Sequence, residues 1–135
     1  MYELREHTAD VAVEAGGETL GDAFAAAADG MAAAMCEDVP DGGERFKVAE
    51  TANSRERLLY DYLDRLIYER DVRGVLPVDN AATVTDTADG YRLTGSARGV
   101  PLADVHARDL KAVTYSEMDV AETETGWRAY VVFDV

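Results

Sequence analysis

The chain has 135 residues, of which 47% are hydrophobic and 30% are charged. This size and composition are typical of one globular domain, so we expect a single domain spanning residues 1–135. No apolar run approaches the roughly 20 residues that a membrane-spanning helix needs, and we expect no membrane association. The first ten residues carry charge where a secretory signal needs an apolar stretch, which predicts a cytoplasmic protein.

The charge of the chain is strongly acidic. It contains 27 Asp and Glu against 13 Lys and Arg, a net charge of -14 at pH 7. Because phosphate recognition depends on clustered cations, and the cations here are scattered among carboxylates, we expect no direct binding to nucleic acid. An acidic chain with few lysines is typical of a salty cytoplasm, where salt screens the self-repulsion. An acidic protein from an ordinary cell is the alternative.

Apolar periodicity predicts two amphipathic helices. The first follows Thr19, a residue that can cap it, and its apolar positions are Leu20, Phe24, Ala27, Met31 and Met35. Gly30 weakens this helix, and a loop over residues 38–43 ends it. The second begins at Asn53 or Ser54 and ends at Gly74, with an apolar stripe of Leu58, Leu59, Tyr62, Leu63, Leu66 and Ile67.

Alternating apolar residues predict the strands. One strand over residues 11–15 ends at Gly16-Gly17, and a short one covers residues 45–50. Residues 81–87 and 91–98 form a hairpin around turn 88–90, and residues 110–123 and 127–134 form another around Thr125-Gly126. Two helices packed on a largely antiparallel or mixed β-sheet make an α+β fold.

Ordinary catalytic motifs are missing from the sequence. It has no glycine-rich phosphate loop, no pair of histidines at helical spacing with a glutamate, and no nucleophile elbow, so a stand-alone enzyme is not indicated. Cys36, His7 and His106 make a poor zinc cage, and a bound metal should be a hard ion held by oxygens. We expect Cys36 to be a packing residue buried beside Met31 and Met35.

Carboxylates near the two ends of the chain are candidate metal ligands. Asp10 closes the segment His7-Thr8-Ala9-Asp10, and Asp134 precedes Val135, whose α-carboxylate adds another hard donor suited to Ca²⁺ or Mg²⁺. If the first and last strands run side by side, these groups meet and repel one another unless a cation lies among them. The alternatives are a local turn-capping role for Asp10 and frayed terminal residues.

Lys111 is a second candidate. The chain uses arginine for nearly every cation, and Lys47 is the other lysine. A lysine kept in a strand can present a compact ammonium to a phosphate or carboxylate, which the planar guanidinium does less well. The alternative is an ordinary solvated strand residue.

Four motifs together resemble the archease family over nearly the whole chain. They are His7-Thr8-Ala9-Asp10 with the strand that follows, the helical segment Leu58-Leu59-Tyr60-Asp61-Tyr62-Leu63, the strand Lys111-Ala112-Val113-Thr114-Tyr115, and the ending from Trp127 to Val135. The length is typical of archaeal members, so with the acidic composition the resemblance points to a halophilic archaeon.

The resemblance implies a role as a protein cofactor rather than an enzyme. Archease-type proteins act on the RtcB-type RNA-splicing ligase, which joins tRNA halves with GTP and a divalent metal through a histidine-guanylate intermediate. They promote guanylylation and multiple turnover, and they can broaden the nucleotide used. The implied partner is therefore this ligase, and the implied cofactor is a divalent ion, Ca²⁺, Mg²⁺ or Mn²⁺.

The resemblance also assigns residues. Asp10 and Asp134 match the family's acidic metal site, completed by the Val135 carboxylate or carbonyl, and Lys111 matches a lysine linked to ligase activation. Asp61 matches an acidic helix position, which we expect to pair with Arg65 one turn later. Ser116 departs from the pattern, since many members have a histidine there, and Ser cannot replace an imidazole in proton transfer or metal ligation.

Two other functions are compatible with the sequence. A general chaperone or adaptor would keep RNA-processing enzymes soluble through its acidic surface, with little dependence on Asp10. A small metal-dependent enzyme would use Asp10, His7 and Asp134 on a phosphorylated substrate, although no nucleophile or phosphate cradle is recognisable.

Overall fold

The computed structural model describes residues 1–6 and 10–135. The elements before the second helix are β1 (Tyr2–Glu6), β2 (Asp10–Gly17), α1 (Leu20–Met35) and β3 (Glu44–Ala52). Those that follow are α2 (Arg55–Arg73), β4 (Val75–Thr87), β5 (Gly90–Pro101), the short 3₁₀ helix η1 (Leu102–Asp104), β6 (Ala112–Thr123) and β7 (Gly126–Asp134).

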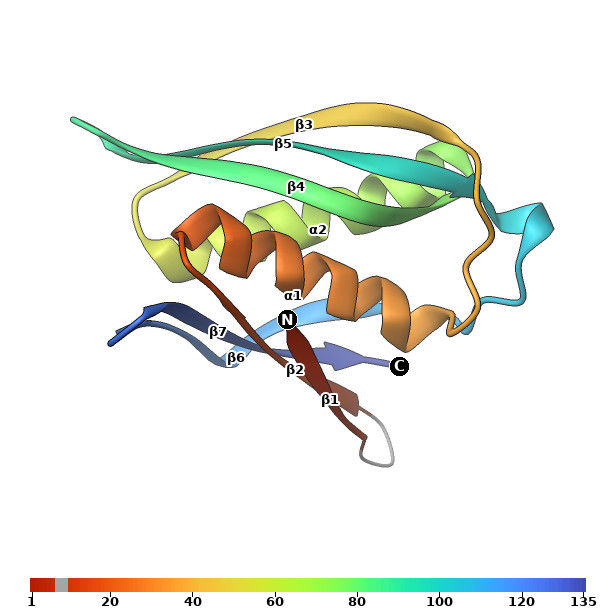
Figure 1. Ribbon diagram of the computed structural model, residues 1–135, viewed down its shortest axis with the longest axis horizontal. Helices are drawn as coiled ribbons and strands as arrows, with labels where there is room; N and C mark the ends of the chain where they lie inside the picture. Colours follow the sequence, from red (N-terminus) through yellow and green to blue (C-terminus); the bar gives the residue numbers. More distant parts are fainter. Residues whose placement is uncertain (7–9) are drawn as a thin grey trace.

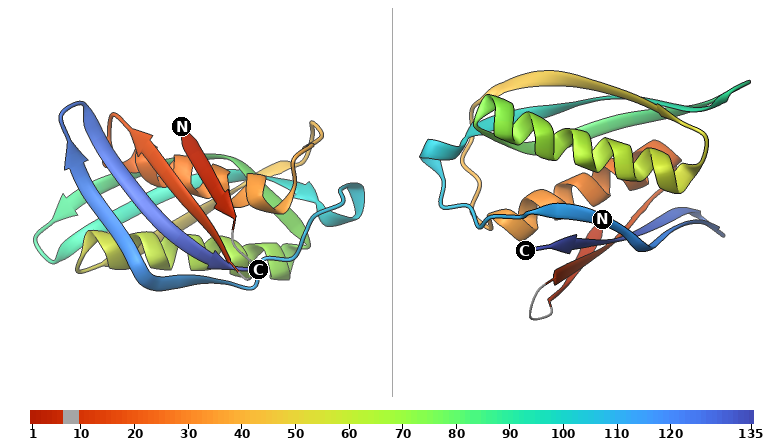
Figure 2. Two further views of the ribbon diagram at one scale, coloured as in Figure 1. Left: turned by 90° about the horizontal axis from the view of Figure 1, so that it is seen from below. Right: turned by 180° about the vertical axis from the view of Figure 1, so that it is seen from behind.

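The elements form three layers, with both helices between two sheets (Figure 1). One sheet has the strand order β1-β2-β7-β6 and the other β3-β5-β4, and every strand pair is antiparallel. Figure 2 shows the four-stranded sheet from below, with β7 between β2 and β6. The α+β class expected from the sequence is confirmed, and the antiparallel sheet is divided in two.

The predicted caps define the helix ends. The Thr19 hydroxyl accepts a hydrogen bond from the amide of Asp22 at 3.0 Å, and the Ser54 hydroxyl accepts one from the amide of Arg57 at 3.1 Å. Ser54, rather than Asn53, is therefore the cap of α2. Gly74 ends α2 in the left-handed conformation at φ 66°, which glycine adopts without a Cβ clash.

Helix α1 has sheets on two sides, which explains its alanine and glycine content. At its first turn, a Cβ on Gly21 would collide with the carbonyl oxygen of Ala82 in β4. On the opposite side, a Cβ on Gly30 would lie 2.6 Å from a methyl carbon of Val13 in β2. The sequence suggests that Gly30 weakens the helix, but the structure shows that this glycine permits close packing.

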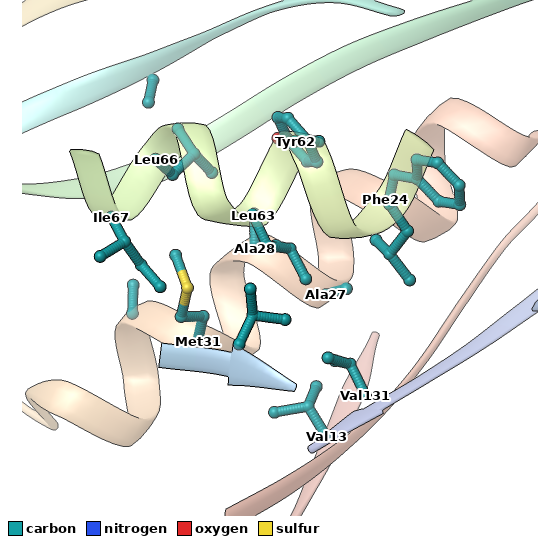
Figure 3. Close-up of a cluster of buried hydrophobic side chains, with 14 of the residues drawn as sticks. Val13, Phe24, Ala27, Ala28, Met31, Tyr62, Leu63, Leu66, Ile67 and Val131 are labelled. Carbon is teal, nitrogen blue, oxygen red and sulfur yellow. The ribbon is translucent and has the colours of Figure 1, made fainter. Parts of the chain in front are cut away.

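Both sheets and both helices contribute to one hydrophobic core. Figure 3 shows α1 and α2 side chains meeting Val13 of β2 and Val131 of β7. Phe24, Met31 and Tyr62 are fully buried there, and Cys36 is buried with Met31 and Met35 as expected. A shared core supports the single domain expected over the chain.

Strand β1 and the first half of strand β4 were not predicted from the sequence. Strand β1 was not expected, because its charged residues hide the alternation of Tyr2 and Leu4, which pair with Ala15 and Val13 of β2. Strand β4 starts directly after Gly74 and includes Pro77, which an edge strand tolerates because one side needs no amide donor. A bulge then shifts the register between Val78 and Ala81.

Among the residues that the model describes, no helix combines the length and apolar character needed to cross a membrane.

The tight approach of α1 to β4 can be tested with Gly21→Ala. Alanine has the better helix propensity, but its methyl group would meet backbone atoms of Ala82 and Thr83, which cannot move aside cheaply. We expect the free energy of unfolding to fall by about 1–3 kcal/mol, measured by urea denaturation. Gly16→Ala is the matched control, because its Cβ would make an ordinary 3.5 Å contact. Equal stability of the two variants would contradict the packing argument.

The Tyr62 hydroxyl offers a second test of the core. It is buried and has no hydrogen-bond partner among the described residues, and burial, with the charge of Asp29 second, raises the pKa of the phenol. Removing an unsatisfied buried hydroxyl relieves its desolvation cost, so Tyr62→Phe should leave stability unchanged or raise it by up to about 1 kcal/mol. A loss above about 1 kcal/mol in thermal and urea unfolding would show that the hydroxyl has a partner.

Candidate functional site

Pairing of β2 with β7 brings the start of β2 next to the C-terminal end of the chain. In this antiparallel pair Asp10 lies directly opposite Asp134, and Val11 lies opposite Phe133. Cross-strand neighbours have Cβ atoms about 4.5–5.5 Å apart, and like charges in that position destabilise a sheet. The strand that follows Asp10 therefore lies beside the last strand, an arrangement that the sequence left open.

The two carboxylates lie on the face of the sheet that is turned away from the helices. Val11 and Phe133, the next pair in the ladder, are fully buried on the helix side. Since side chains alternate along a strand, Asp10 and Asp134 point to the other side. Asp134 is exposed and Asp10 is partly buried.

Among the described residues, Asp10 has no cationic partner of the kind that a neighbouring carboxylate has. Glu14, two ladder positions further along the same face of β2, accepts a 2.8 Å hydrogen bond from Arg128, and this bond holds the pKa of Glu14 below its usual range. By contrast, Asp10 Oδ1 is buried with no hydrogen-bond partner in the part of the chain that the structure describes. A buried carboxylate oxygen without a partner is costly unless a cation satisfies it.

Lys111 is joined to this pair through its backbone. Its amide donates a 2.8 Å hydrogen bond to the carbonyl oxygen of Asp134, and Ala112 pairs with Asp134 across β6 and β7. The Lys111 side chain is exposed and makes no ion pair with the residues that the structure describes. The Lys111 backbone therefore lies beside Asp134, and its side chain is exposed to solvent.

Arg70 fixes the segment that leads into Lys111. This arginine of α2 is buried, and its guanidinium donates a 2.9 Å hydrogen bond to the carbonyl of Leu110. It also pairs with Asp71 at 2.9 Å and lies 3.9 Å from Asp109. This positioning role was not predicted from the sequence, although Arg70 follows Ile67, the last residue of the apolar stripe of α2, by three residues, a signal that could have indicated it.

Of the two histidines, only His106 is described, and it lies away from the carboxylate pair. His7, with Thr8 and Ala9, lies outside the described residues. His106 is exposed and lines a hollow of about 470 Å³ at the end of α1, together with Cys36, whose thiol donates to the carbonyl of Asp38 at 3.3 Å.

The expected pairing of Asp61 with Arg65 is wrong. Asp61 pairs with Arg57, one turn earlier, at 3.1 Å. Arg65 instead reaches Glu50 of β3 at 3.0 Å, because α2 lies close to that strand. A tertiary ion pair thus replaces the local one that the helical spacing suggested.

Ser116, the position that departs from the family motif, lies in a bulge of β6. The register of β6 against β7 shifts between Thr114 and Asp119, and Glu117 adopts a positive φ of 64°. The Thr114 hydroxyl donates to the Ser116 carbonyl at 3.3 Å. Ser116 is therefore exposed on an edge strand, beyond the Thr114–Val132 pair that lies two ladder rows from Asp134.

The arrangement fits a hard divalent cation as an incomplete protein site. Within the described residues, no group of three or more His, Cys, Asp or Glu side chains is placed to hold a metal. Asp10 and Asp134 supply two carboxylates, and a main-chain oxygen of Val135 can add a third oxygen, the donor type that Ca²⁺ and Mg²⁺ prefer. The unsatisfied Asp10 Oδ1 is the observation that favours such an ion.

Comparison with known proteins agrees with the fold and with the sequence motifs. Residues 2–135 match the family described as "Archease protein family (MTH1598/TM1083)". The chain belongs to the archease family. It is 31% identical to the protein archease of Methanothermobacter thermautotrophicus, covering 99% of this chain and 98% of that one. The archease of Thermococcus gammatolerans is 33% identical with the same coverage.

Two solved structures extend the comparison to the archease fold. The solution structure of Methanobacterium thermoautotrophicum protein 1598 is 30% identical, with a TM-score of 0.86 over 99% of this chain and 98% of that one. The crystal structure of a Thermotoga maritima archease, described as a possible chaperone, is 21% identical, with a TM-score of 0.66 over 100% and 98%. The second comparison supports the fold alone.

The anchoring role of Arg70 can be tested with Arg70→Met, which keeps the apolar stem. Loss of the guanidinium leaves the buried Leu110 carbonyl without its donor, so we expect stability to fall by about 1–3 kcal/mol. Hydrogen exchange should also rise at the Lys111 amide and across residues 108–111. Arg57→Met, which breaks an exposed helix pair, is the control and should change stability by less than about 0.5 kcal/mol. Unchanged exchange at Lys111 would contradict the anchoring role.

Proposed function

We propose that this chain activates an RNA ligase of the RtcB type, promoting its guanylylation and multiple turnover. The observation that supports the proposal is the pairing of Asp10 with Asp134 across the central strands, with one buried carboxylate oxygen left unsatisfied. The chain belongs to the archease family. The RtcB-type ligase as its partner and the bound metal ion are our proposals.

The carboxylates would hold a divalent ion at one end of the four-stranded sheet. Asp10, Asp134 and a main-chain oxygen of Val135 would be the protein ligands. A bound ion would supply a concentrated positive charge able to interact with phosphate oxygens in the ligase's nucleotide pocket. The β2–β7 ladder holds both residues on paired strands, so the positions of the two carboxylates would be fixed before docking.

Lys111 would contact the partner directly. Its amide is held by Asp134, and the segment before it is held by Arg70, so the base of the side chain is fixed while the ammonium is exposed. In the complex, the ammonium would offset nearby phosphate or carboxylate charge. The net charge of -14 would steer the chain toward the basic face of an RNA-binding enzyme, an attraction that salt weakens.

A general chaperone or adaptor is the second candidate. The Thermotoga maritima relative is described as a possible chaperone, and this chain exposes apolar side chains at Tyr68 and Val72, one turn apart on α2. A chaperone acting through that surface would protect unrelated clients without needing Asp10.

The test compares Asp10→Asn and Asp134→Asn with Glu122→Gln, a control that removes an exposed carboxylate from the same sheet. Ligation by the cognate ligase, present in substoichiometric amount, is followed through both the guanylated intermediate and the product. We expect each Asn variant to lose at least about tenfold of the stimulation, and the control to keep it. Removing one of two opposed carboxylates should leave the melting temperature unchanged or raise it.

Metal binding has its own readout without the ligase. Titration calorimetry with Ca²⁺, Mg²⁺ and Mn²⁺ should give a heat of binding that both Asn variants lose and Glu122→Gln retains. Unchanged ligase turnover with either Asn variant would contradict the proposed mechanism. If the wild-type chain gives no stimulation but prevents aggregation of unrelated clients, the chaperone function replaces the proposal.

A further inference from the structure

The three-stranded sheet has one face without a covering layer. Phe46 and Val48 of β3 and Leu93 and Ala97 of β5 are buried against the helices. The residues that alternate with them face the other side, where Figure 1 shows no other described element. Over the ladder rows from Arg92 to Arg98, we call the exposed and half-buried residues of this side the outer face: Arg45, Lys47, Ala49, Thr51, Ala81, Thr83, Thr85, Arg92, Thr94, Ser96 and Arg98. Val78, opposite Arg98, and Val100 are buried in the core, so the outer face ends at that row.

The outer face is basic on an acidic protein. Four of the chain's 13 Lys and Arg lie on it, and none of its residues is acidic, although the chain has 27 carboxylate side chains. Asp79, in the adjoining bulge, is the carboxylate that approaches, and it pairs with Arg98 at 2.7 Å. The local charge of this face is thus opposite to the net charge.

Three cations on this face have no carboxylate partner among the described residues. Arg45 bonds to neutral oxygens, the Ser96 hydroxyl and the Asp79 carbonyl, each at 2.8 Å. Lys47 and Arg92 form no ion pair within residues 1–6 and 10–135. Several arginines elsewhere have a carboxylate within 4.0 Å, among them Arg5, Arg57, Arg65, Arg70, Arg73 and Arg128.

The donors form an ordered row. Arg98, Ser96, Thr94 and Arg92 follow one another on the same side of the central strand β5, over a span of about 20 Å at about 3.3 Å per residue. Lys47 lies beside Ser96, and Thr83 lies beside Thr94. These four neighbours line a shallow hollow in the middle of the face.

The composition of the face favours a phosphate backbone over a protein surface. Stable protein interfaces are centred on buried aromatic or large apolar side chains, and the outer face has no apolar residue larger than alanine. Phosphate contacts need only cations and polar donors, which this row supplies. Without aromatic rings the face cannot stack bases, so contact is limited to the backbone. The hydroxyls between the cations can bond to ribose 2′-hydroxyls, which DNA lacks.

We propose that the outer face binds the ribose-phosphate backbone of RNA without reading its sequence. This goes beyond the proposed function and does not depend on the carboxylate site. The net charge predicts no direct nucleic-acid binding if the cations are scattered among carboxylates, as they are along the sequence. The fold gathers three unneutralised cations on one rigid surface, while carboxylates elsewhere repel RNA and confine it to this face.

The test measures fluorescence anisotropy of a labelled tRNA transcript between 50 and 200 mM NaCl. With three phosphates neutralised, the logarithm of the affinity should fall against the logarithm of salt with a slope of about -2 to -3. Lys47→Glu with Arg92→Glu should weaken binding at least tenfold at the lowest salt and reduce the slope by about 1.5. Arg5→Glu with Arg57→Glu, an equal charge change away from this face, should change affinity less than twofold.

Further arms separate the alternatives. DNA of the same sequence should bind more weakly than the RNA, and a poly-glutamate peptide should not compete for the face. Equal affinity for DNA, competition by the peptide, equal loss in both double variants, or no binding by the wild-type chain at 50 mM NaCl would each overturn the proposal. Guanylylation of the ligase without RNA should be unaffected by Lys47→Glu with Arg92→Glu, so this test and that of the carboxylate site fail independently.

Discussion

The passage of α1 between the two sheets is the constraint on which the rest of the structure depends. Unlike α2, α1 has little solvent-exposed surface for large polar residues, and it must approach backbone on both sides. Gly21 against β4 and Gly30 against β2 permit that approach, and alanines fill most of the remaining positions. α1 follows β2 directly and lies between the two sheets. β2 accordingly lies in the interior of its sheet, next to β7. The candidate site is a consequence of that placement.

The site is built from residues far apart in the sequence but adjacent in the sheet. Asp10 and Asp134 are brought together by ladder register alone, while Lys111 enters through the neighbouring strand and depends on a buried arginine of α2. The contrast with Glu14 is informative, because the same strand face carries one carboxylate paired with Arg128 and one, Asp10, whose buried Oδ1 has no partner among the described residues. A protein that only needed a stable sheet would gain by pairing both carboxylates.

Local patterns in the sequence predicted much of the fold and less of the surface. Thr19, Gly74 and the apolar stripe of α2 act within a few residues, so the helices and their ends could be predicted. Strand β1 was missed because its burial comes from pairing with β2, and Asp61 was given the wrong partner because Glu50 lies nearer to Arg65 in space. The candidate ligands were predicted through motifs, whereas Arg70 and the basic outer face emerge only when strands are placed side by side.

The bulge in β6 also affects how the molecule meets copies of itself. Strand β6 is a sheet edge of 12 residues, long enough to template pairing with another strand. The register shift between Thr114 and Asp119, with the left-handed turn at Glu117, interrupts the row of free amides and carbonyls near its middle. The two uninterrupted portions, residues 112–114 and 119–123, offer an approaching strand less continuous backbone than the full edge would. The irregularity that exposes Tyr115 and Ser116 thereby also protects the edge against fibre-like self-association.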